Sequence, residues 1–253
     1  MTSIVRLSCI ATVALVLGAA ASLCARAQTE SHPDAAHGDQ MHGGTLYGQV
    51  LVEQLEYRWK DGHDVTAWDA QAWYGGDYEK LRLKTEGNLR SPQRVNDAEA
   101  QLLYSRLVGY YWDLQAGVRH DFRPKPSRSY AVIGLQGLAP GYFEVDASTF
   151  VSQDGDLSAR LKADYDLLIT QRLILQPKME INVAARDVPE LHTAAGLNDI
   201  ELGLRLRYEF AREFAPYVGV NWKRNLGETA QLVRRSGDDP DEVAGLVGVR
   251  FWF

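Results

Sequence analysis

The residues with the clearest chemistry lie near the amino end of the chain. Three histidines recur there every five residues, together with two carboxylates and one thioether: His32, Asp34, His37, Asp39, Met41 and His42. Neutral imidazole and carboxylate are ligands for Cu(II), Ni(II) and Zn(II), whereas thioether sulfur selects Cu(I). The segment therefore predicts a divalent metal site of modest affinity, because a flexible chain loses backbone freedom when it wraps an ion. The alternative is a polar linker with incidental histidines.

The segment before these histidines is typical of a secretory signal. Arg6 precedes an apolar run that ends near Ser22, and Ala25-Arg26-Ala27 fits a cleavage site. We expect residues 1–27 to be removed, and with them both cysteines, Cys9 and Cys24, so that disulfides and thiolate metal sites are excluded. The polar residues 28–44 cannot build a core and predict a disordered tail. The remaining domain spans residues 45–253.

The composition limits the possible partners of this domain. The chain has 33 acidic and 27 basic residues, a formal net charge of −6, and the predicted signal contains no acid. An acidic chain of this kind makes nucleic acid an improbable partner. Outside the signal, no apolar run reaches the ~18 residues that a membrane helix needs.

Twelve strand-like segments follow the tail. We expect them at 46–58, 65–74, 78–86, 95–107, 110–121, 129–138, 142–152, 157–168, 171–184, 199–210, 213–223 and 243–253. In 199–210, for example, Leu204 faces one way and Arg205 the other, as period-two alternation requires. Glu53 and Asp69 each interrupt the alternation of apolar and polar residues in their segment, which predicts a bulge or a different register in the first strands.

The connections between these segments alternate in length. Short ones, such as Gly75-Gly76-Asp77 and Val108-Gly109, alternate with longer ones, such as 185–198 and 224–242. Short periplasmic turns and longer outside loops are typical of outer-membrane barrels, and an even strand count brings both ends to one side. The fold class is therefore all-β, a transmembrane antiparallel barrel of twelve strands.

The end of the chain supports this interpretation. The last segment alternates apolar with small or polar residues and closes on Phe253, which resembles the signal that the bacterial barrel assembly machinery reads. Aromatic residues also gather near segment ends, as the two interfacial girdles of a bilayer protein require. We therefore expect a bilayer environment in the outer membrane of a Gram-negative bacterium.

In each segment, the residues that alternate with the apolar ones include charges of both signs. The candidate lumen residues are Glu99, Asp121, Glu144, Asp146, Asp164, Arg205 and Arg207. Two interpretations stay open, a network of ion pairs that fills and stiffens the barrel, and a charged pathway for a solute. Long side chains can largely occlude a lumen of this size.

Several motifs in order resemble one family. They are Trp68–Tyr78, Lys84–Gly87, Asp97–Arg106, Trp112–Asp121, Gly137–Pro140, Thr170–Pro177 and Phe214–Val220. Over residues 45–253 the chain resembles the copper resistance protein B family of Gram-negative outer membranes. The resemblance implies a non-enzymatic protein that binds copper ions and sequesters them or helps to export them from the periplasm. It also implies that the protein acts together with a periplasmic multicopper oxidase and copper-binding proteins. Family members often have a longer tail rich in Met and His, so the single Met41 here predicts weak Cu(I) binding.

Two other functions fit a barrel of this size. A general diffusion porin needs a wide lumen and usually a loop folded inward, for which only 224–242 is long enough. An outer-membrane phospholipase needs a Ser near a His on the outer wall, oriented by a third polar group. His120 is predicted on that wall, with Ser127 and Ser129 in the neighbouring loop, whereas His63 and His192 are predicted in outside loops.

Overall fold

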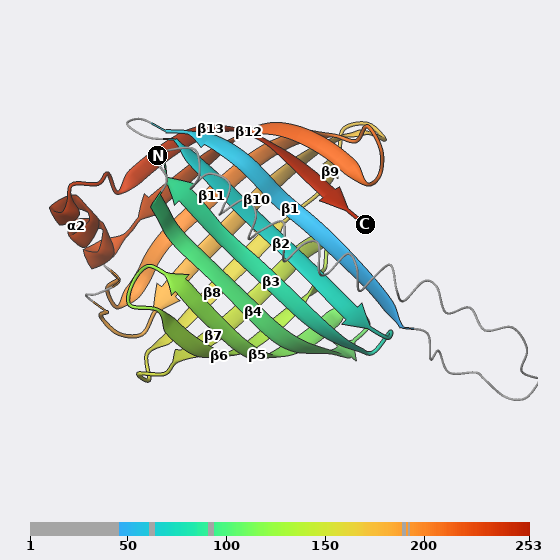
Figure 1. Cartoon of the computed structure of the whole chain (residues 1–253). Coiled ribbons are helices and arrows are strands. Elements are labelled where there is room, and N and C mark those ends of the chain that lie inside the picture. Colours follow the sequence, from blue (N-terminus) through green and yellow to red (C-terminus); the bar gives the residue numbers. More distant parts are fainter. Residues whose placement is uncertain (1–45, 61–63, 91–93, 189–190, 192) are drawn as a thin grey trace, which may run out of the picture.

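The computed structural model describes residues 46–60, 64–90, 94–188, 191 and 193–253. The predicted signal and tail, residues 1–27 and 28–44, lie outside these ranges. Within them nearly the whole chain forms one antiparallel sheet that curls into a barrel (Figure 1).

The strands follow one another round the barrel in chain order. Their bounds are β1 Tyr47–Trp59, β2 Val65–Gly75, β3 Glu79–Arg90, β4 Arg94–Gly109, β5 Trp112–Arg123, β6 Arg128–Ala139, β7 Phe143–Ser152, β8 Leu157–Asp164, β9 Leu167–Leu168, β10 Leu173–Ala184, β11 Gly196–Tyr208, β12 Phe214–Asn225 and β13 Asp241–Trp252. β13 pairs with β1, and the Val50 amide and carbonyl bond Phe253 at 2.9 and 3.0 Å, so the sheet closes on itself. Closure leaves no sheet edge with unpaired backbone groups in lipid.

β8 and β9 are two parts of one strand. Asp164 pairs with Lys178, and Leu168 pairs with Ile174 in the same register. The interruption lies opposite Pro177, which has no N–H to donate to the ladder. Counting the two parts together gives a barrel of twelve strands, and the predicted fold class is confirmed.

A register change in β1 explains why Glu53 breaks the sequence pattern. The pairing with β2 skips a residue between Val52 and Gln54, and the pairing with β13 changes in the same place. This is the bulge that the sequence predicted, and it lets Glu53 and Gln54 both line the lumen. Asp69 lines the lumen as well.

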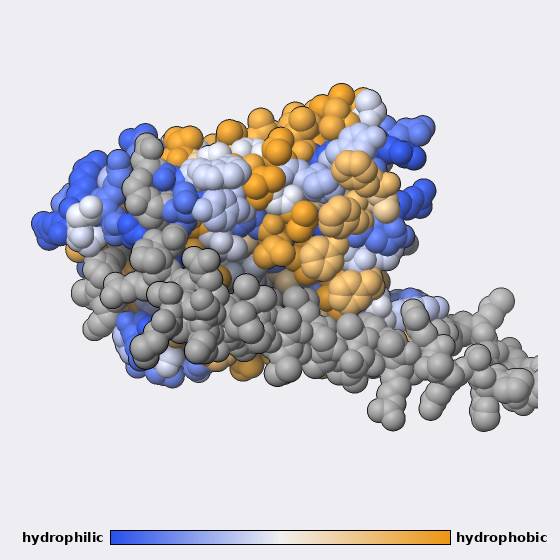
Figure 2. All heavy atoms as spheres, turned by 45° about the horizontal axis from the view of Figure 1, so that its top comes forward, coloured by the Kyte–Doolittle hydropathy of each residue, from blue (hydrophilic) through white to orange (hydrophobic). Residues whose placement is uncertain are grey.

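The outer wall carries an apolar band. Leu204 and Leu161 are 42% and 36% exposed, whereas Arg205 beside Leu204 is 3% exposed. Figure 2 shows the apolar residues gathered in a band over the strands, with hydrophilic residues at both ends of the barrel. Exposed aromatic side chains lie at the rims, including Tyr78, Tyr110, Tyr142 and Phe210 at one end and Trp59 at the other. This arrangement fits a bilayer with an aromatic girdle at each interface.

The connections at the two ends differ as predicted. One end has short turns, such as 76–78, 110–111 and 140–142, and the other has longer loops. The sequence predicted only a loop at 224–242, but this segment contains the helix α2, Gly227–Ser236. Glu228 in its first turn and Arg234 and Arg235 in its last turn suit the helix dipole. Thr229 fixes the helix to the start of β11, because its hydroxyl accepts a bond from the Ala194 amide at 3.0 Å and donates one to Asn198 Oδ1 at 3.4 Å.

Among the described residues, no helix is both long and apolar enough to cross a membrane.

The residues that face lipid lead to a stability prediction. Leu202 lies at the middle of β11, is 42% exposed and pairs across the strands with Trp222. We expect Leu202→Arg to lower the free energy of unfolding by about 2–4 kcal/mol, since a guanidinium would enter the hydrocarbon. Denaturant unfolding in lipid vesicles measures it, with Leu202→Val as the control. Equal stability of the two variants would mean that this face does not contact lipid.

Candidate functional site

The chemically active side chains of the described chain gather in the lumen, which contains two cavities. The inner cavity has a volume of about 470 Å³ and reaches Tyr111 and Leu138 beside the short turns. The outer cavity has a volume of about 790 Å³ and extends to the long loops and to Val233 of α2. Since short turns mark the periplasmic side, the inner cavity faces the periplasm.

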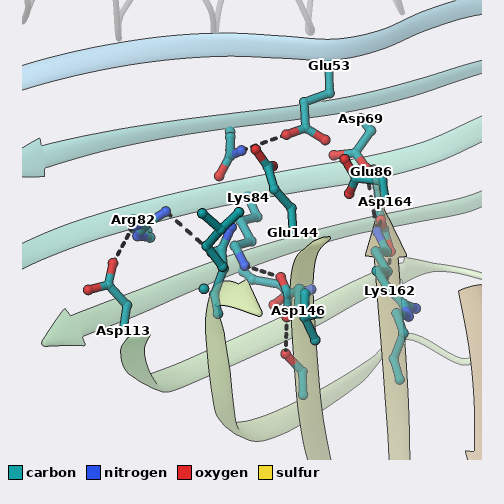
Figure 3. A pocket seen from close by; sticks show the side chains of 18 of the residues that line it. Glu53, Asp69, Arg82, Lys84, Glu86, Asp113, Glu144, Asp146, Lys162 and Asp164 are labelled. Carbon is teal, nitrogen blue, oxygen red and sulfur yellow. Dashed lines mark hydrogen bonds and ion pairs between the residues drawn. The ribbon is translucent and has the colours of Figure 1, made fainter. Parts of the chain in front are cut away.

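β3 supplies a row of basic side chains to the inner cavity. Lys80, Arg82 and Lys84 occupy alternate positions and therefore point to the same side of the strand. Arg82 Nη2 donates to Asp113 at 2.7 Å, and Lys84 Nζ donates to Asp146 at 2.6 Å (Figure 3). Each of these bonds joins β3 to a strand farther round the barrel, so the pairs cross part of the lumen.

Other acids of the inner cavity lack such partners. Glu53 accepts a hydrogen bond from the Gln71 amide at 2.9 Å, and Asp164 accepts one from the Gln176 amide at 3.2 Å. Within the described part of the chain, Glu53, Asp164 and Glu144 form no ion pair, although all three line the cavity (Figure 3). The inner cavity therefore carries carboxylates whose charge is not neutralised by a direct contact.

Six side chains line both cavities and separate one from the other. We call them the central layer: Asp69, Glu86, Phe150, Arg160, Lys162 and Lys178. Lys162 forms an ion pair with Glu86 and lies 3.5 Å from Asp69, measured from Nζ to Oδ2. Arg160 also pairs with Glu86, and Lys178 Nζ lies 3.8 Å from Asp69 Oδ2.

Glu99 joins the central layer to the outer cavity. Its carboxylate accepts two bonds from Arg160 at 3.1 Å and pairs with Arg119 Nη2 at 2.5 Å. The guanidinium carbons of Arg119 and Arg160 lie 4.7 and 5.6 Å from the ring centre of Phe150. Each arginine therefore contacts both the ring of Phe150 and the carboxylate of Glu99. These two contacts together restrain its guanidinium group.

Two further arginines lie against the barrel wall. Arg205 Nη2 donates to Glu56 at 2.8 Å and Arg207 Nη2 donates to Asp166 at 2.7 Å, and both arginines are almost fully buried. Gly203 makes room for Arg205, since a Cβ at this position would collide with the guanidinium. Arg205 lines the outer cavity as predicted, and both arginines are packed closely against the wall of the barrel.

The predicted lumen residues occupy different parts of this arrangement. Glu144, Asp146 and Asp164 line the inner cavity, whereas Glu99 and Asp121 line the outer cavity. The predicted tail ligands lie outside the described residues: His32, Asp34, His37, Asp39, Met41 and His42. In the described ranges, no three His, Cys, Asp or Glu side chains come together as a group that could hold a metal ion.

His120 lies where the phospholipase alternative needs it. Its Nδ1 lies 2.9 Å from Ser129 Oγ, and the contact is exposed on the outer wall. The other described contact of the imidazole is an edge-to-face packing against Phe122 at 4.8 Å. A catalytic histidine needs a third polar group to orient it. A cross-strand His–Ser pair without such a group has the form of an ordinary sheet contact.

Sequence reasoning missed several lumen residues. Lys84 and Glu86 continue the alternation of Lys80 and Arg82, a signal that was present in the sequence within the predicted strand 78–86. The bulge in β1 interrupts the alternation at Glu53, so the sequence pattern did not show that this side chain faces the lumen. Phe150 shares its parity with Glu144, Asp146 and Ser148, so the alternation in this strand could have placed it on the lumen side.

A closed antiparallel barrel with an apolar belt and a lumen crossed by ion pairs defines an outer-membrane β-barrel protein. The comparisons with known proteins then give the family. Residues 46–253 match the family described as copper resistance protein B precursor (CopB). The chain belongs to the copper resistance protein B family, as its motifs predicted, and its location is the outer membrane of a Gram-negative bacterium.

Two relatives support this assignment, and one solved structure shares the fold. The chain is 47% identical over 204 residues to copper resistance protein B of Escherichia coli, covering 81% of this chain and 69% of the relative. It is 42% identical over 205 residues to a homolog from Pseudomonas syringae pv. tomato, covering 80% and 69%. A solved NanC porin superposes with a TM-score of 0.53 at 15% identity, covering 81% of this chain and 98% of the porin, which shows a shared fold.

The Glu99 contacts lead to a second stability prediction. Glu99→Ala leaves the guanidinium groups of Arg119 and Arg160 without their shared carboxylate. We expect a loss of up to about 3 kcal/mol in the free energy of unfolding, since one partner of a buried pair is removed. Asp238→Ala is the control, because the Arg90–Asp238 pair at 3.4 Å is solvent-exposed and should contribute about 0–1 kcal/mol. Equal losses, measured by denaturant unfolding in vesicles, would contradict this role of Glu99.

Proposed function

We propose that this protein receives copper ions on the periplasmic side of the outer membrane and holds them or helps to export them, without catalysing a reaction. Membership of the copper resistance protein B family supports a role in copper resistance. The observation that carries the proposal further is the inner cavity, which faces the periplasm and contains Glu53, Glu144 and Asp164, three acids that form no ion pair with any residue the structure describes. Oxygen ligands with unneutralised charge attract a divalent cation.

We also propose that the tail captures the metal first. His32, His37 and His42 offer three imidazoles, with Asp34, Asp39 and Met41 as accessory ligands. Nitrogen and oxygen donors favour Cu(II) over Zn(II), while one sulfur gives little affinity for Cu(I). The tail joins the barrel at its periplasmic end, where β1 begins, so captured copper would be delivered near the inner cavity. A periplasmic multicopper oxidase and copper-binding proteins are the proposed source.

The role of the cavity can be tested by copper tolerance. A strain that lacks the gene should be more sensitive to copper, and the unmodified gene should restore tolerance. We expect the triple variant Glu53→Gln/Glu144→Gln/Asp164→Asn to restore less, because the cavity loses three negative charges. Asp238→Asn/Asp239→Asn, on the outer loop, is the matched control. A deletion strain with unchanged tolerance would refute the copper role, and full restoration by the triple variant would refute the role of the cavity.

The role of the tail can be tested by calorimetry. We expect about one Cu(II) per tail, with an affinity that falls as the pH drops through roughly 6.5, the ordinary pKa of histidine, because protonated imidazole cannot bind a metal. His32→Ala/His37→Ala/His42→Ala should lose this binding. His63→Ala/His192→Ala, which changes two predicted loop histidines, should keep it. Equal copper affinity in the two variants would leave the tail as a linker.

A further inference from the structure

The central layer lies across the barrel, between its opposite walls. β2, which carries Asp69, and β8, which carries Lys162, are equally far apart in both directions round the ring of strands. The 3.5 Å contact between their side chains therefore spans the lumen. Glu86 on β3 meets Arg160 and Lys162 from the same side. Side chains from opposite walls thus meet at the depth where the two cavities adjoin.

The charges of the central layer are neutralised within it and by its neighbours. Three cations, Arg160, Lys162 and Lys178, contact Asp69 and Glu86, and Arg160 also contacts Glu99 and Glu180. The side chains of Arg160 and Lys162 are only 15% and 18% exposed. A passing ion would have to break at least one of these pairs, and it meets little free charge that would compensate for lost hydration.

We infer that the central layer closes the lumen to ions at rest, and that Lys162 is the side chain that a passing cation has to displace. The ammonium group of Lys162 occupies the space between Glu86 and Asp69. A divalent cation carries twice the charge of this ammonium and can bind both carboxylates, whereas a chloride ion has no favourable place there. Lys162 and Arg160 are therefore specificity-determining residues for divalent cations. The inference goes beyond the proposed copper role and holds for any metal cargo.

The geometry also separates this layer from the other charged residues. Arg82 and Lys84 on β3 have the same Arg-x-Lys spacing as Arg160 and Lys162 on β8. They are likewise paired, with Asp113 and Asp146, but they line only the inner cavity. Their removal would enlarge a cavity that is already open, whereas removal of Arg160 and Lys162 would join the two cavities.

Conductance in planar lipid bilayers tests the inference with potassium chloride alone. The unmodified barrel should show no stepwise openings. Arg160→Ala/Lys162→Ala should gain them, and Arg82→Ala/Lys84→Ala should stay silent. The opened pore should prefer potassium to chloride, because Asp69, Glu86 and Glu99 then outnumber Lys178 and Arg119. Slower gel migration after heating confirms that each variant is a folded barrel.

Labelling of cysteine variants gives a second measurement. Ser148 lines the inner cavity and Ser158 the outer one. A membrane-impermeant thiol reagent added to a planar bilayer only on the side of the long loops should reach Ser158→Cys but not Ser148→Cys, unless Arg160→Ala/Lys162→Ala is also present.

Steady conductance of the unmodified barrel would overturn the inference. Openings of the same size in both double variants would overturn it too, as would silence of a folded Arg160→Ala/Lys162→Ala barrel. Copper tolerance is measured in a separate experiment. If the proposed copper role is refuted there, the conductance and labelling results still test the central layer.

Discussion

The structure depends on one constraint, which is that lipid accepts no charge on the outer wall. Successive residues of a strand alternate between lipid and lumen, so the charged residues of a strand gather inside. A twelve-stranded barrel has a narrow lumen, and long side chains from opposite walls meet there. The cross-lumen pairs of Lys162, Arg160 and Lys84 follow from this confinement, because an unpaired charge would lose its hydration without compensation.

The same confinement explains why the pairs form where they do. The bulge at Glu53 brings two consecutive residues to the lumen, with Glu53 in the inner cavity and Gln54 in the outer one. Phe150 adds an aromatic face that orients Arg119 and Arg160 toward Glu99. The bulge and Phe150 both change how the charges are arranged in the lumen. The barrel itself is held together by the backbone hydrogen bonds between strands and by the pairing of β13 with β1.

Much of this fold could be predicted from the sequence, because alternation and loop lengths are local signals. The strand at 199–210 and the opposite directions of Leu204 and Arg205 are examples. Helix α2 was missed because it is only ten residues long and mostly polar, so that it resembles a loop. The pairing of Lys162 with Glu86 could not be predicted, since strand tilt and stagger decide which residues meet across a lumen. The metal ligands proposed from the sequence lie outside the described residues, and their role stays a prediction.

The position of the central layer decides what the inner cavity can do. In the proposed function, with the layer paired, the inner cavity is a pocket that opens only to the periplasm, and its carboxylates would keep a metal ion near the periplasmic side. Export requires that Lys162 leave Glu86 and Asp69, which joins the pocket to the outer cavity. On this proposal, holding and exporting a metal ion would be two states of one arrangement of charges, and the balance between them would depend on how strongly a cation competes with Lys162. The carboxylates Glu53, Glu144 and Asp164 raise the local concentration of that competitor, because they lie in the same cavity as the ammonium group it must displace.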